Sequence, residues 1–583
     1  MKVVFLGGGS LRLLPLIRGV FWHTPEFFRN GEICLVDKMA ERAEAVGKLM
    51  MACPEYESVR CKITWSTDLD TALPGTDIVY LTMGARRQPT RSQAMFLANQ
   101  YGYIYTDNLS INGAFLSLRL GRTILDIAWK MEKYCPEALM LIFPNPVAVY
   151  SHLVNTHTKI KALGICGGFS NHRWDLTRVL GRNEYDPGWN VVAAGVNHMS
   201  FILRGTWHGK DIYKEVLPER LTPFWKPLEI ETGNPWLKES YERAQLAVVT
   251  MFKKYGSVVF STEMDGLFHL FPDDELAFQR KRYGFGENFD PVQAVNNEQN
   301  NIRQKYEEFI ASSKNPRAIN WDAPSELYSR KESDIIIPIF RAVSGQESMR
   351  IVASRPNNGA VRNLRDDMPL EYTMDILGRE ITPVEDQYIP EPFCGLVSAL
   401  AEFQRLQSEA IAAWDPALFA AALDAYPVDQ FKEKRKIFFR KMFDLFSDLD
   451  PHMLSAGKYF EPDSSRRQEH DKRYRIEDMK ELEPIRCPCG FTRRAFASDS
   501  DKTASLHIVD IQQDSKVHYH QEHTEIYHIL EGSGWLELEG EKIPVQPGLS
   551  IRISPYCRHR AVGKLKVMNV SIPAFDPRDE WFD

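Results

Sequence analysis

Residues 1–10 read MKVVFLGGGS. The apolar run Val3 to Leu6 predicts a buried strand, the turn after it is Gly7-Gly8-Gly9-Ser10, and the apolar residues from Leu11 to Phe21 predict a helix. A pyrophosphate site requires this order, because glycines let the backbone approach the phosphates and the helix N-terminus offers free N–H groups. The stretch therefore predicts a dinucleotide-binding domain of the Rossmann type.

A carboxylate ends the next predicted strand. The apolar run Ile33 to Val36 is followed by Asp37, which can accept hydrogen bonds from both hydroxyls of an adenosine ribose and so favours NAD over NADP. The usual G-x-G-x-x-G pattern is incomplete, because its third glycine falls on Arg12. A purely structural glycine turn is the alternative, and the acid together with the strand and helix repeat favours the nucleotide site.

Apolar runs alternate with helix-like segments through residues 1–165. The runs are Val3 to Leu6, Ile33 to Val36, Ile78 to Thr82, Ala138 to Phe143 and Ile160 to Ile165. This pattern is typical of an α/β fold with a doubly wound parallel sheet, in which ligands bind beyond the carboxyl ends of the strands. Residues 166–428 mix strands with helices and predict an α+β domain for substrate, metal and oligomerisation.

The remaining sequence divides into two parts. Residues 429–480 carry dense charge and predict a surface helix followed by a solvated connector. Residues 481–583 consist of short alternating segments with glycine and proline between them, which predicts a small all-β barrel.

The overall composition favours a small-molecule partner. The net charge of −7 excludes the broad basic surface of a nucleic-acid-binding protein, and no stretch approaches the ~20 apolar residues of a membrane span. The first residues form a core strand rather than a signal peptide, so we expect a cytoplasmic protein. Nine cysteines, an odd number without a disulfide framework, predict reduced thiols, and Cys487-Pro-Cys489 is interpreted as a loop.

Two residues at predicted strand ends suggest a metal site. Cys166 follows the run Ile160 to Ile165, and His198 follows Val191 to Val196. A thiolate and an imidazole suit a borderline divalent cation that keeps open positions for substrate hydroxyls. A lone buried cysteine or histidine is usually part of a core, and this alternative stays open on spacing alone.

Several motifs together resemble glycoside hydrolase family 4, the NAD- and metal-dependent glycosidases. They are the glycine turn at Gly7, the loop from Tyr101 to Gly113, Asn145-Pro146, Cys166, Gly195-Val-Asn-His198 and Asn358-Gly-Ala-Val-Arg-Asn-Leu364. The resemblance covers residues 1 to about 425. It implies Cys166 and His198 as ligands of Mn²⁺ or a similar ion, with Asn145 and Asn197 contacting cofactor or sugar hydroxyls.

The resemblance also implies a mechanism with transient redox chemistry. NAD⁺ oxidises C3 of the sugar, a base removes the C2 proton, the aglycone leaves by elimination, water adds, and hydride returns to C3. The expected substrate is a small glycoside, including one with an anionic group. The further cofactor and substrate residues that we expect are Gly84, Arg86, Arg87, Arg91, Asn112 and Asn358.

The chain departs from the family beside the metal-binding cysteine. Members resemble Cys-Asp or Cys-Asn there, whereas this chain has Gly167, so the group that protonates the aglycone is not identified. The candidate acids and bases are Asp107, Asp265, His172, Tyr105 and Tyr103.

The last segment resembles a cupin. The family supplies three histidines and a glutamate to one metal, and the matching residues here are His518, His520, Glu525 and His559. Because side chains two apart on a strand share a face, His518 and His520 can reach a common ligand. A barrel whose histidines are only structural or sugar-binding is the alternative.

Three functions remain open at the level of sequence. The preferred one is an NAD-dependent, Mn²⁺-assisted glycosidase that forms a homodimer or homotetramer. An NAD-dependent dehydrogenase of a sugar or hydroxy acid is the second, because the same sheet resembles that of lactate and malate dehydrogenases. A sugar-sensing protein without turnover is the third.

Overall fold

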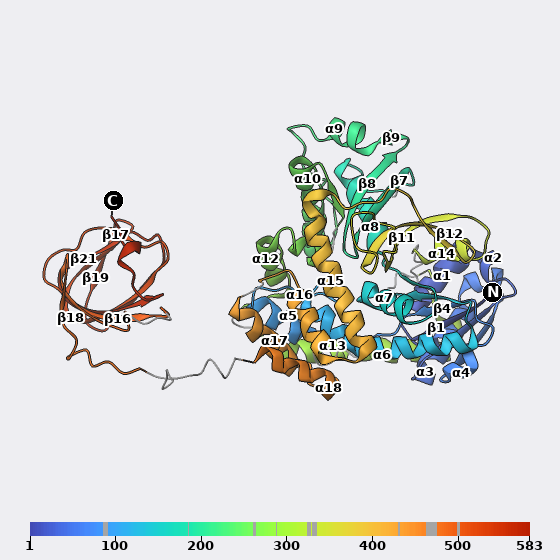
Figure 1. The fold of residues 1–583 in the computed structure, drawn as a ribbon, viewed down its shortest axis with the longest axis horizontal. Helices are drawn as coiled ribbons and strands as arrows, with labels where there is room; N and C mark the ends of the chain where they lie inside the picture. The colour runs from blue at the N-terminus through green and yellow to red at the C-terminus, as the bar shows by residue number, and fades with distance from the viewer. Residues whose placement is uncertain are drawn as a thin grey trace. The chain divides into compact units, whose positions relative to one another are not determined.

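The computed structural model describes residues 1–84, 91–184, 186–260, 264–286, 289–322, 328, 335–429, 432–461, 475–497 and 502–582, and only the backbone of residues 168–173, 260, 264 and 265. These residues form two compact units, Met1–Glu461 and Pro462–Asp583 (Figure 1). Each unit is described by itself. The predicted division of the first unit at residue 165 stays a prediction.

A sheet of parallel strands forms the N-terminal half of the first unit. The strands are β1 (Lys2–Leu6), β2 (Glu32–Val36), β3 (Lys62–Ser66), β4 (Ile78–Leu81), β5 (Leu139–Ile142) and β6 (Ala162–Gly164). Their order is β3-β2-β1-β4-β5-β6, and every neighbouring pair is parallel. This order reverses direction at β1, so it confirms the predicted doubly wound sheet, and sheets of this type bind ligands at such a point.

Strand β3 was not among the predicted strands. It lies at the edge of the sheet, and its five side chains are exposed or half-buried. Its sequence, Lys62-Ile-Thr-Trp-Ser66, therefore lacks the continuous apolar run by which the buried strands were recognised.

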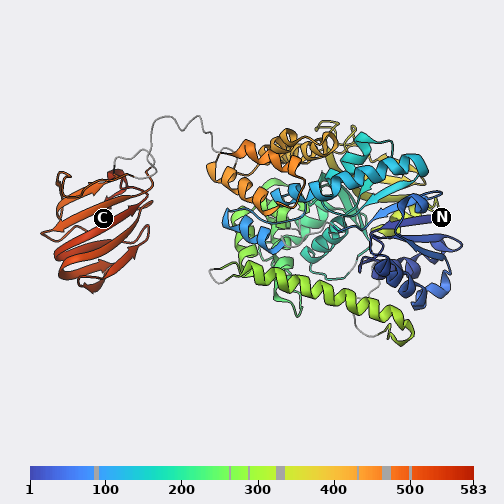
Figure 2. The ribbon, with the colours of Figure 1, turned by 90° about the horizontal axis from the view of Figure 1, so that it is seen from below.

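Helices cover both faces of the parallel sheet. The helices of this part of the chain are α1 (Leu13–His23), α2 (Pro25–Phe28), α3 (Ala40–Ala52), α4 (Leu69–Ala72), α5 (Arg91–Gln100), α6 (Ile111–Tyr134), α7 (Val147–His157) and α8 (Gly168–Val179), of which α5 and α8 pack mainly on later helices. Helices α1 and α3, dark blue in Figure 2, contact each other on one face, and the cyan helices α6 and α7 contact each other on the other. The apolar runs of β1, β4 and β5 are buried between these layers.

Antiparallel strands continue the same sheet beyond β6. They are β7 (Trp189–Val196), β8 (Met199–Trp207), β9 (Lys210–Asp211), β10 (Val258–Phe260), β11 (Met349–Pro356), β12 (Pro369–Leu377) and β13 (Glu380–Pro383). Among the described residues the sheet has 13 strands, and Ser354 of β11 pairs with Gly164 of β6. The two halves of the first unit thus share one sheet.

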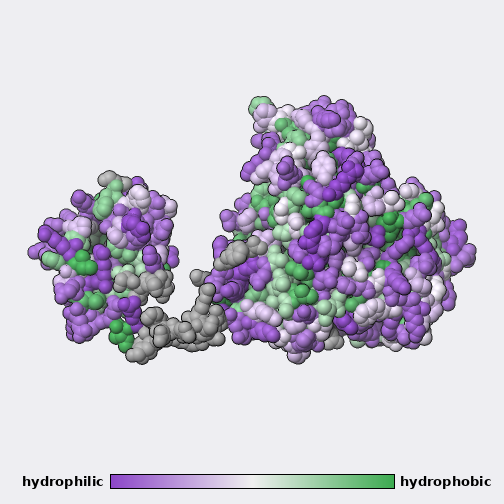
Figure 3. All heavy atoms as spheres, in the orientation of Figure 1, coloured by the Kyte–Doolittle hydropathy of each residue, from purple (hydrophilic) through white to green (hydrophobic). Residues whose placement is uncertain are grey.

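The rest of the first unit is helical. Its helices are α9 (Leu217–Arg220), α10 (Pro235–Tyr255), α11 (Met264–Phe268), α12 (Pro272–Tyr283), α13 (Pro291–Lys314), α14 (Ile336–Val343), α15 (Glu391–Ala413), α16 (Pro416–Ala425), α17 (Glu433–Leu445) and α18 (Pro451–Leu454). None of the helices in the described part of the chain is long and apolar enough to cross a membrane. Hydrophilic side chains cover most of each unit on the face that Figure 3 shows.

Helix α17 shows how a charge-dense segment becomes part of a core. Its Phe438, Phe439 and Met442 are fully buried, although charged residues surround them in sequence. Arg435 is also buried, and its guanidinium donates to the carbonyls of Leu423, Asp424, Tyr426 and Val428, at and just beyond the end of α16. One face of the helix is therefore core and the opposite face carries the charge.

The second unit is an antiparallel β structure, which confirms the predicted cupin fold. Its strands are β14 (Ile485–Cys487), β15 (Gly490–Ala495), β16 (Ser505–Ile511), β17 (His518–Tyr519), β18 (Thr524–Leu538), β19 (Glu541–Val545), β20 (Ser550–Ile553), β21 (His559–Ile572) and β22 (Trp581–Phe582). The long strands β18 and β21 pair along most of their length. Apolar residues such as Ile529, Leu536 and Val567 form its separate core.

Candidate active site

Several of the predicted site residues of the first unit follow neighbouring parallel strands. Asp37 follows β2, the glycine turn follows β1, Gly84 lies after β4, Asn145 after β5 and Cys166 after β6. The carboxyl ends of parallel strands meet at one edge of the sheet. Because adjacent strands lie ~4.8 Å apart, β1 and β6 are separated by three spacings, or ~14 Å.

The backbone of the glycine turn is packed too closely for side chains. Gly7 has a φ of 85°, which favours glycine. A Cβ atom added to Gly8 would lie 2.7 Å from both the Cβ of Leu35 and the backbone nitrogen of Val36. One added to Gly9 would lie 2.4 Å from the Cβ of Arg42. The turn therefore fits directly against β2 and α3 at Gly8 and Gly9, so packing alone favours glycine at these positions.

Asp37 has a second role that its spacing did not predict. Its Oδ2 accepts a hydrogen bond from the backbone N–H of Gly9 at 2.9 Å, and its Oδ1 accepts one from Met39 at 2.9 Å. Each carboxylate oxygen has a further lone pair, so these contacts leave acceptor capacity for a ribose. The carboxylate links the turn after β1 to the turn after β2.

A cavity of about 350 Å³ lies beside the glycine turn, between α3 and α13. Its lining includes Arg42, Gln299 and Tyr306, and the Arg42 guanidinium lies 3.7 Å from the centre of the Tyr306 ring. Since Arg42 also contacts the position of Gly9, the cavity adjoins the adenosine end of the predicted dinucleotide site.

The structure brings Cys166 and His198 together from two different elements. Cys166 lies between β6 and α8, and His198 lies in the two-residue turn that joins β7 to β8. The Cys166 Sγ and the His198 Nε2 are 3.5 Å apart. His198 has a φ of 70°, a left-handed conformation that tight hairpin turns require. Both atoms can bind one divalent ion, with open positions for substrate.

A buried polar network holds the β7–β8 turn, and three of its four members were missed by the sequence analysis. Asn197 donates to Glu371 Oε2 at 2.6 Å, and Ser200 donates to Glu371 Oε1 at 2.6 Å. Asn108 donates to the side-chain oxygen of Asn197. Glu371 is 3% exposed, so this carboxylate is satisfied entirely inside the protein.

Glu371 and Asn108 are therefore positioning residues of the candidate site. The signal for Glu371 was a single carboxylate within Leu370-Glu-Tyr-Thr-Met374, an apolar stretch that forms the buried strand β12. Asn108 lay within the loop that was singled out, but nothing in the sequence distinguished it from its polar neighbours.

Asn112 has an unpaired amide close to this network. It is 1% exposed, and neither its Oδ1 nor its Nδ2 has a hydrogen-bond partner among the described residues. It lies in the first turn of α6, four residues after Asn108. Buried side-chain amides nearly always have hydrogen-bond partners, so the unpaired amide of Asn112 is a candidate to bind a ligand. Asn145 is half-buried and precedes a cis bond to Pro146.

Arg91, Tyr105 and Asp107 form a second group of predicted residues. Burial lowers the pKa of Arg91, but the neighbouring Asp107 and Tyr105 outweigh it, so the pKa is raised overall. Arg91 also lies 3.9 Å from Glu298 of α13. Burial raises the pKa of Tyr103, whose ring stacks on Phe438 at 4.5 Å, so this residue belongs to the core against α17.

The other predicted residues are in different positions. Asn358 is exposed, with a φ of 45°, whereas its neighbour Asn357 is buried and ties the loop together by donating to the carbonyls of Val361 and Leu364. Arg86 and Arg87 lie outside the described residues. The side chains of His172 and Asp265 lie outside them as well.

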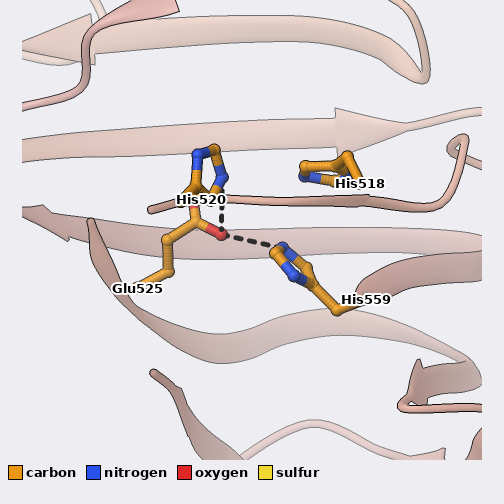
Figure 4. A group of neighbouring side chains, drawn as sticks. All are labelled: His518, His520, Glu525 and His559. Carbon is orange, nitrogen blue, oxygen red and sulfur yellow. Dashed lines mark hydrogen bonds and ion pairs between the residues drawn. The ribbon is translucent and has the colours of Figure 1, made fainter. Parts of the chain in front are cut away.

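The four cupin residues form one cluster, which we call the cupin tetrad: His518, His520, Glu525 and His559. One ligand atom from each lies within 4.8 Å of the others, and the side chains point toward one another (Figure 4). Glu525 Oε2 is 3.0 Å from His559 Nε2 and 3.6 Å from His520 Nε2. Three imidazoles and one carboxylate are a donor set for a divalent metal ion.

Hydrogen bonds behind the tetrad fix the orientation of its rings. The Nδ1 atoms of His518, His520 and His559 lie 2.9, 2.7 and 2.9 Å from the backbone carbonyls of Lys516, Asp579 and Cys557. A carbonyl only accepts hydrogen bonds, so each Nδ1 carries a proton. The lone pair of each Nε2 can then coordinate a metal ion. Asn569 donates to Glu525 Oε1 at 2.7 Å and holds the carboxylate.

Comparison with known proteins covers both units. The family described as family 4 glycosyl hydrolase matches residues 2–181, its C-terminal domain matches residues 193–427, and a cupin domain matches residues 505–568. An alpha-galactosidase of Bacillus subtilis is 29% identical over 219 residues, 37% of this chain and 50% of that protein. A 6-phospho-beta-glucosidase of Escherichia coli is 27% identical over 220 residues, 37% of this chain and 48% of that protein.

The matched region spans about half the length of these two relatives. Among solved structures, a 6-phospho-alpha-glucosidase from gut microorganisms, in complex with NAD and Mn²⁺, superimposes with a TM-score of 0.63 at 18% identity. The superposition covers 77% of this chain and 99% of that one. At this identity the likeness shows the fold, and it extends over the first unit rather than over the sheet alone.

Proposed function

Because the chain belongs to glycosyl hydrolase family 4 and carries a cupin domain, we propose that it is a glycoside hydrolase that uses NAD and a divalent metal ion such as Mn²⁺. The observation that carries the proposal is the 3.5 Å approach of Cys166 Sγ to His198 Nε2, at the sheet edge that also bears the glycine turn. A thiolate and an imidazole at this separation fit one borderline divalent ion.

The reaction that we propose is oxidation at C3, deprotonation at C2, elimination of the aglycone, addition of water and return of the hydride. When bound, NAD⁺ accepts and returns the hydride, and the metal ion acidifies the C2 proton as a Lewis acid. Cys166 and His198 hold the ion, and the network through Asn197 and Glu371 keeps the β7–β8 turn in place. Asn112 supplies a buried amide for a sugar hydroxyl.

We take the acid and the base from the candidates of the sequence analysis. Asp107 and Tyr105 lie near Arg91, so two groups that can donate or accept a proton are close to a cation. Asp265 and His172 are the other candidates of the sequence analysis. Gly167 offers no side chain for protonation of the aglycone, so a substrate with a good leaving group needs the least help from the protein.

We further propose that the substrate class includes glycosides with an anionic group. Arg91 is a half-buried cation at the start of α5, and Arg86 and Arg87 precede it in sequence. Arginine pairs phosphate and carboxylate through two parallel hydrogen bonds. The solved relative with NAD and Mn²⁺ is described as acting on a 6-phosphorylated sugar, which supports this class.

One experiment separates the proposed reaction from its main alternative. The purified chain is incubated in D₂O with NAD⁺, Mn²⁺, a reductant and a panel of α- and β-aryl glycosides that includes neutral, phosphorylated and uronic acid sugars. Release of the aglycone with deuterium at C2 of the product, without accumulation of NADH, is the expected result. A steady rise of absorbance at 340 nm without aglycone release identifies a dehydrogenase instead, and binding without turnover identifies a sensor.

A further inference from the structure

The cupin barrel contains a cavity of about 90 Å³ that is lined by more than the tetrad. Thr492 and Arg494 of β15 also line it. Side chains two residues apart on a strand share a face, so both point to the same side of β15. Asn569 of β21 lines the cavity as well.

Outside the tetrad, three polar atoms in this lining have no hydrogen-bond partner among the described residues. The Thr492 Oγ1, the Arg494 Nε and the Asn569 Oδ1 are buried and make no hydrogen bond with any described residue. Thr492 is 2% exposed and Asn569 is 4% exposed. Protein interiors pair nearly all of their buried polar groups, so three unpaired ones around one cavity indicate a polar ligand.

With a divalent ion on the tetrad, the charge of the cavity favours an anion. The Arg494 guanidinium stacks over Phe575 at 4.4 Å, and none of the described carboxylates lies within ion-pair distance of it. Arg494 and Lys516 are cations, whereas Glu525, Glu580 and the low-pKa thiol of Cys487 are anions. A divalent ion on the tetrad therefore gives the cavity a net positive charge.

We propose that the cupin cavity is a second small-molecule site, for a hydroxy acid whose oxygen atoms reach a metal ion on the tetrad and whose carboxylate is paired by Arg494. Thr492 donates its hydroxyl to the same ligand. The Arg494 Nε is buried without a hydrogen-bond partner in the described part of the chain, and a guanidinium in this state is a natural contact for a carboxylate, because charge-assisted hydrogen bonds are strong in a partly desolvated site. This site is separate from the one that contains Cys166.

The volume limits how much of the ligand is enclosed. An engineered protein cavity of ~150 Å³ encloses one benzene molecule. A cavity of about 90 Å³ holds a three-carbon hydroxy acid, or the acidic end of a longer sugar acid whose remainder extends toward the mouth.

The test uses the full chain with Cys166→Ser, so that a metal ion at the first site does not contribute. The protein is loaded with Co²⁺, and the visible spectrum of Co²⁺ and the heat of binding are followed during titration with D-glycerate or with glycerol. The two probes have the same carbon skeleton and differ in the carboxylate. We expect D-glycerate to change the spectrum and to bind at least tenfold more tightly than glycerol.

Variants on one strand show whether Arg494 is responsible. Arg494→Met is expected to weaken D-glycerate by about tenfold to a hundredfold, and Thr492→Val by a few-fold, because each removes one hydrogen bond to the ligand. Arg493→Met, on the opposite face of β15, is expected to bind like the parent. Arg494→Lys keeps the charge and covers the case in which Arg494→Met does not fold.

Three results overturn the proposal. The first is a Co²⁺ spectrum that does not respond to D-glycerate. The second is equal affinity for glycerol and D-glycerate. The third is equal weakening by Arg494→Met and Arg493→Met. None of these readouts depends on glycoside hydrolysis, so the outcome is independent of the function proposed for the first unit.

Discussion

Cys166 and His198 depend on different kinds of local structure. Cys166 lies where β6 gives way to α8, so its position is set by the sheet. His198 lies in a turn of only two residues, and its left-handed backbone is held by the strands on either side. The side chain of Asn197 is held by a hydrogen bond to Glu371 of β12, and this buried pair stabilises the turn. The two candidate ligands are therefore supported by different contacts. A single substitution can weaken the support of one without changing that of the other.

Replacing Cys166 tests the metal site directly. Cys166→Ser is expected to lower the affinity for Mn²⁺ and to reduce glycoside hydrolysis at least a hundredfold, because a serine hydroxyl is not ionised at neutral pH. The melting temperature of the metal-free chain should not change. Mn²⁺ binding is measured by titration calorimetry, with Cys394→Ser of α15 as the control. A Cys166→Ser protein with parental Mn²⁺ affinity would falsify the assignment.

Replacing Glu371 tests the positioning network. Glu371→Gln keeps the shape but cannot accept from both Asn197 and Ser200 as a carboxylate does, and groups behind a metal ligand typically matter by ~10- to 100-fold. We expect a loss of this size in Mn²⁺ affinity and in kcat, with little effect on KM.

The control for Glu371 lies on the same strand. Asp375→Asn affects an exposed carboxylate of β12 that pairs with Arg350 at 2.9 Å. Unchanged Mn²⁺ binding in Glu371→Gln, or an equal effect of Asp375→Asn, contradicts the positioning role.

At the scale of elements, the glycine turn and helix α7 show how contacts between neighbours constrain the site. The turn after β1 touches β2 and α3 at distances that admit no side chain. Helix α7 begins after Asn145 and carries His152, which joins it to α15 and to the loop before β12. The site is thus built on elements whose packing leaves little freedom.

A methyl group in the glycine turn should remove cofactor binding. Gly8→Ala forces the turn away from Leu35 and Val36, and overpacking of this kind costs ~1–3 kcal/mol of stability. We expect the affinity for the dinucleotide to fall at least tenfold, as measured by fluorescence titration with NADH. Gly395→Ala in α15, where no atom lies within 4 Å of an added Cβ, is the control and should bind like the parent.

The pH dependence of stability should report His152. Its ring is 1% exposed, and burial lowers its pKa, with its nitrogens 2.8 Å from Ser408 Oγ and 2.9 Å from the carbonyl of Asp367. The unfolded chain then binds a proton that the folded one does not, so stability is lost as the pH falls below the unfolded value of ~6.5.

The parent and a His152 variant should differ measurably in how steeply their unfolding free energy changes with pH. His152→Gln should reduce the loss of unfolding free energy between pH 6.5 and 5 by up to ~1.4 kcal/mol per pH unit. Urea denaturation of both proteins at several pH values gives the difference. Parallel pH profiles would show that His152 does not titrate between the folded and unfolded states.

At the scale of the whole molecule, two separate cores predict two unfolding transitions. Ile529 is fully buried in the core of the second unit, and Ile33 is fully buried in the sheet of the first. Truncation of a core isoleucine to alanine costs ~2–5 kcal/mol. Ile529→Ala should lower the midpoint temperature of the calorimetric transition of the second unit, and Ile33→Ala that of the first. Coincident shifts in both variants would show that the units unfold together.

The sequence predicted those parts of the molecule whose signals are local. Strand β1 with its glycine turn, the His518-x-His520 pair and the positions of Cys166 and His198 at strand ends could all be recognised from short segments. Strand β3 lacked an apolar run, and the burial of Arg435 depends on carbonyls of α16 that only the fold brings near. Glu371 was missed because its partners, Asn197 and Ser200, are more than 170 residues away in sequence.

The pairing of Ser354 with Gly164 joins the parallel and the antiparallel half of the first unit within a single sheet, which has 13 strands among the described residues. Two halves joined by strand pairing resist the rigid-body rotation by which many two-domain enzymes close on their substrates. Under the proposed function, entry of a sugar and release of the products then rely on motions of helices and loops that flank the sheet. Turnover should accordingly be more sensitive to substitutions in those flanking segments than to any change at the junction of the two halves.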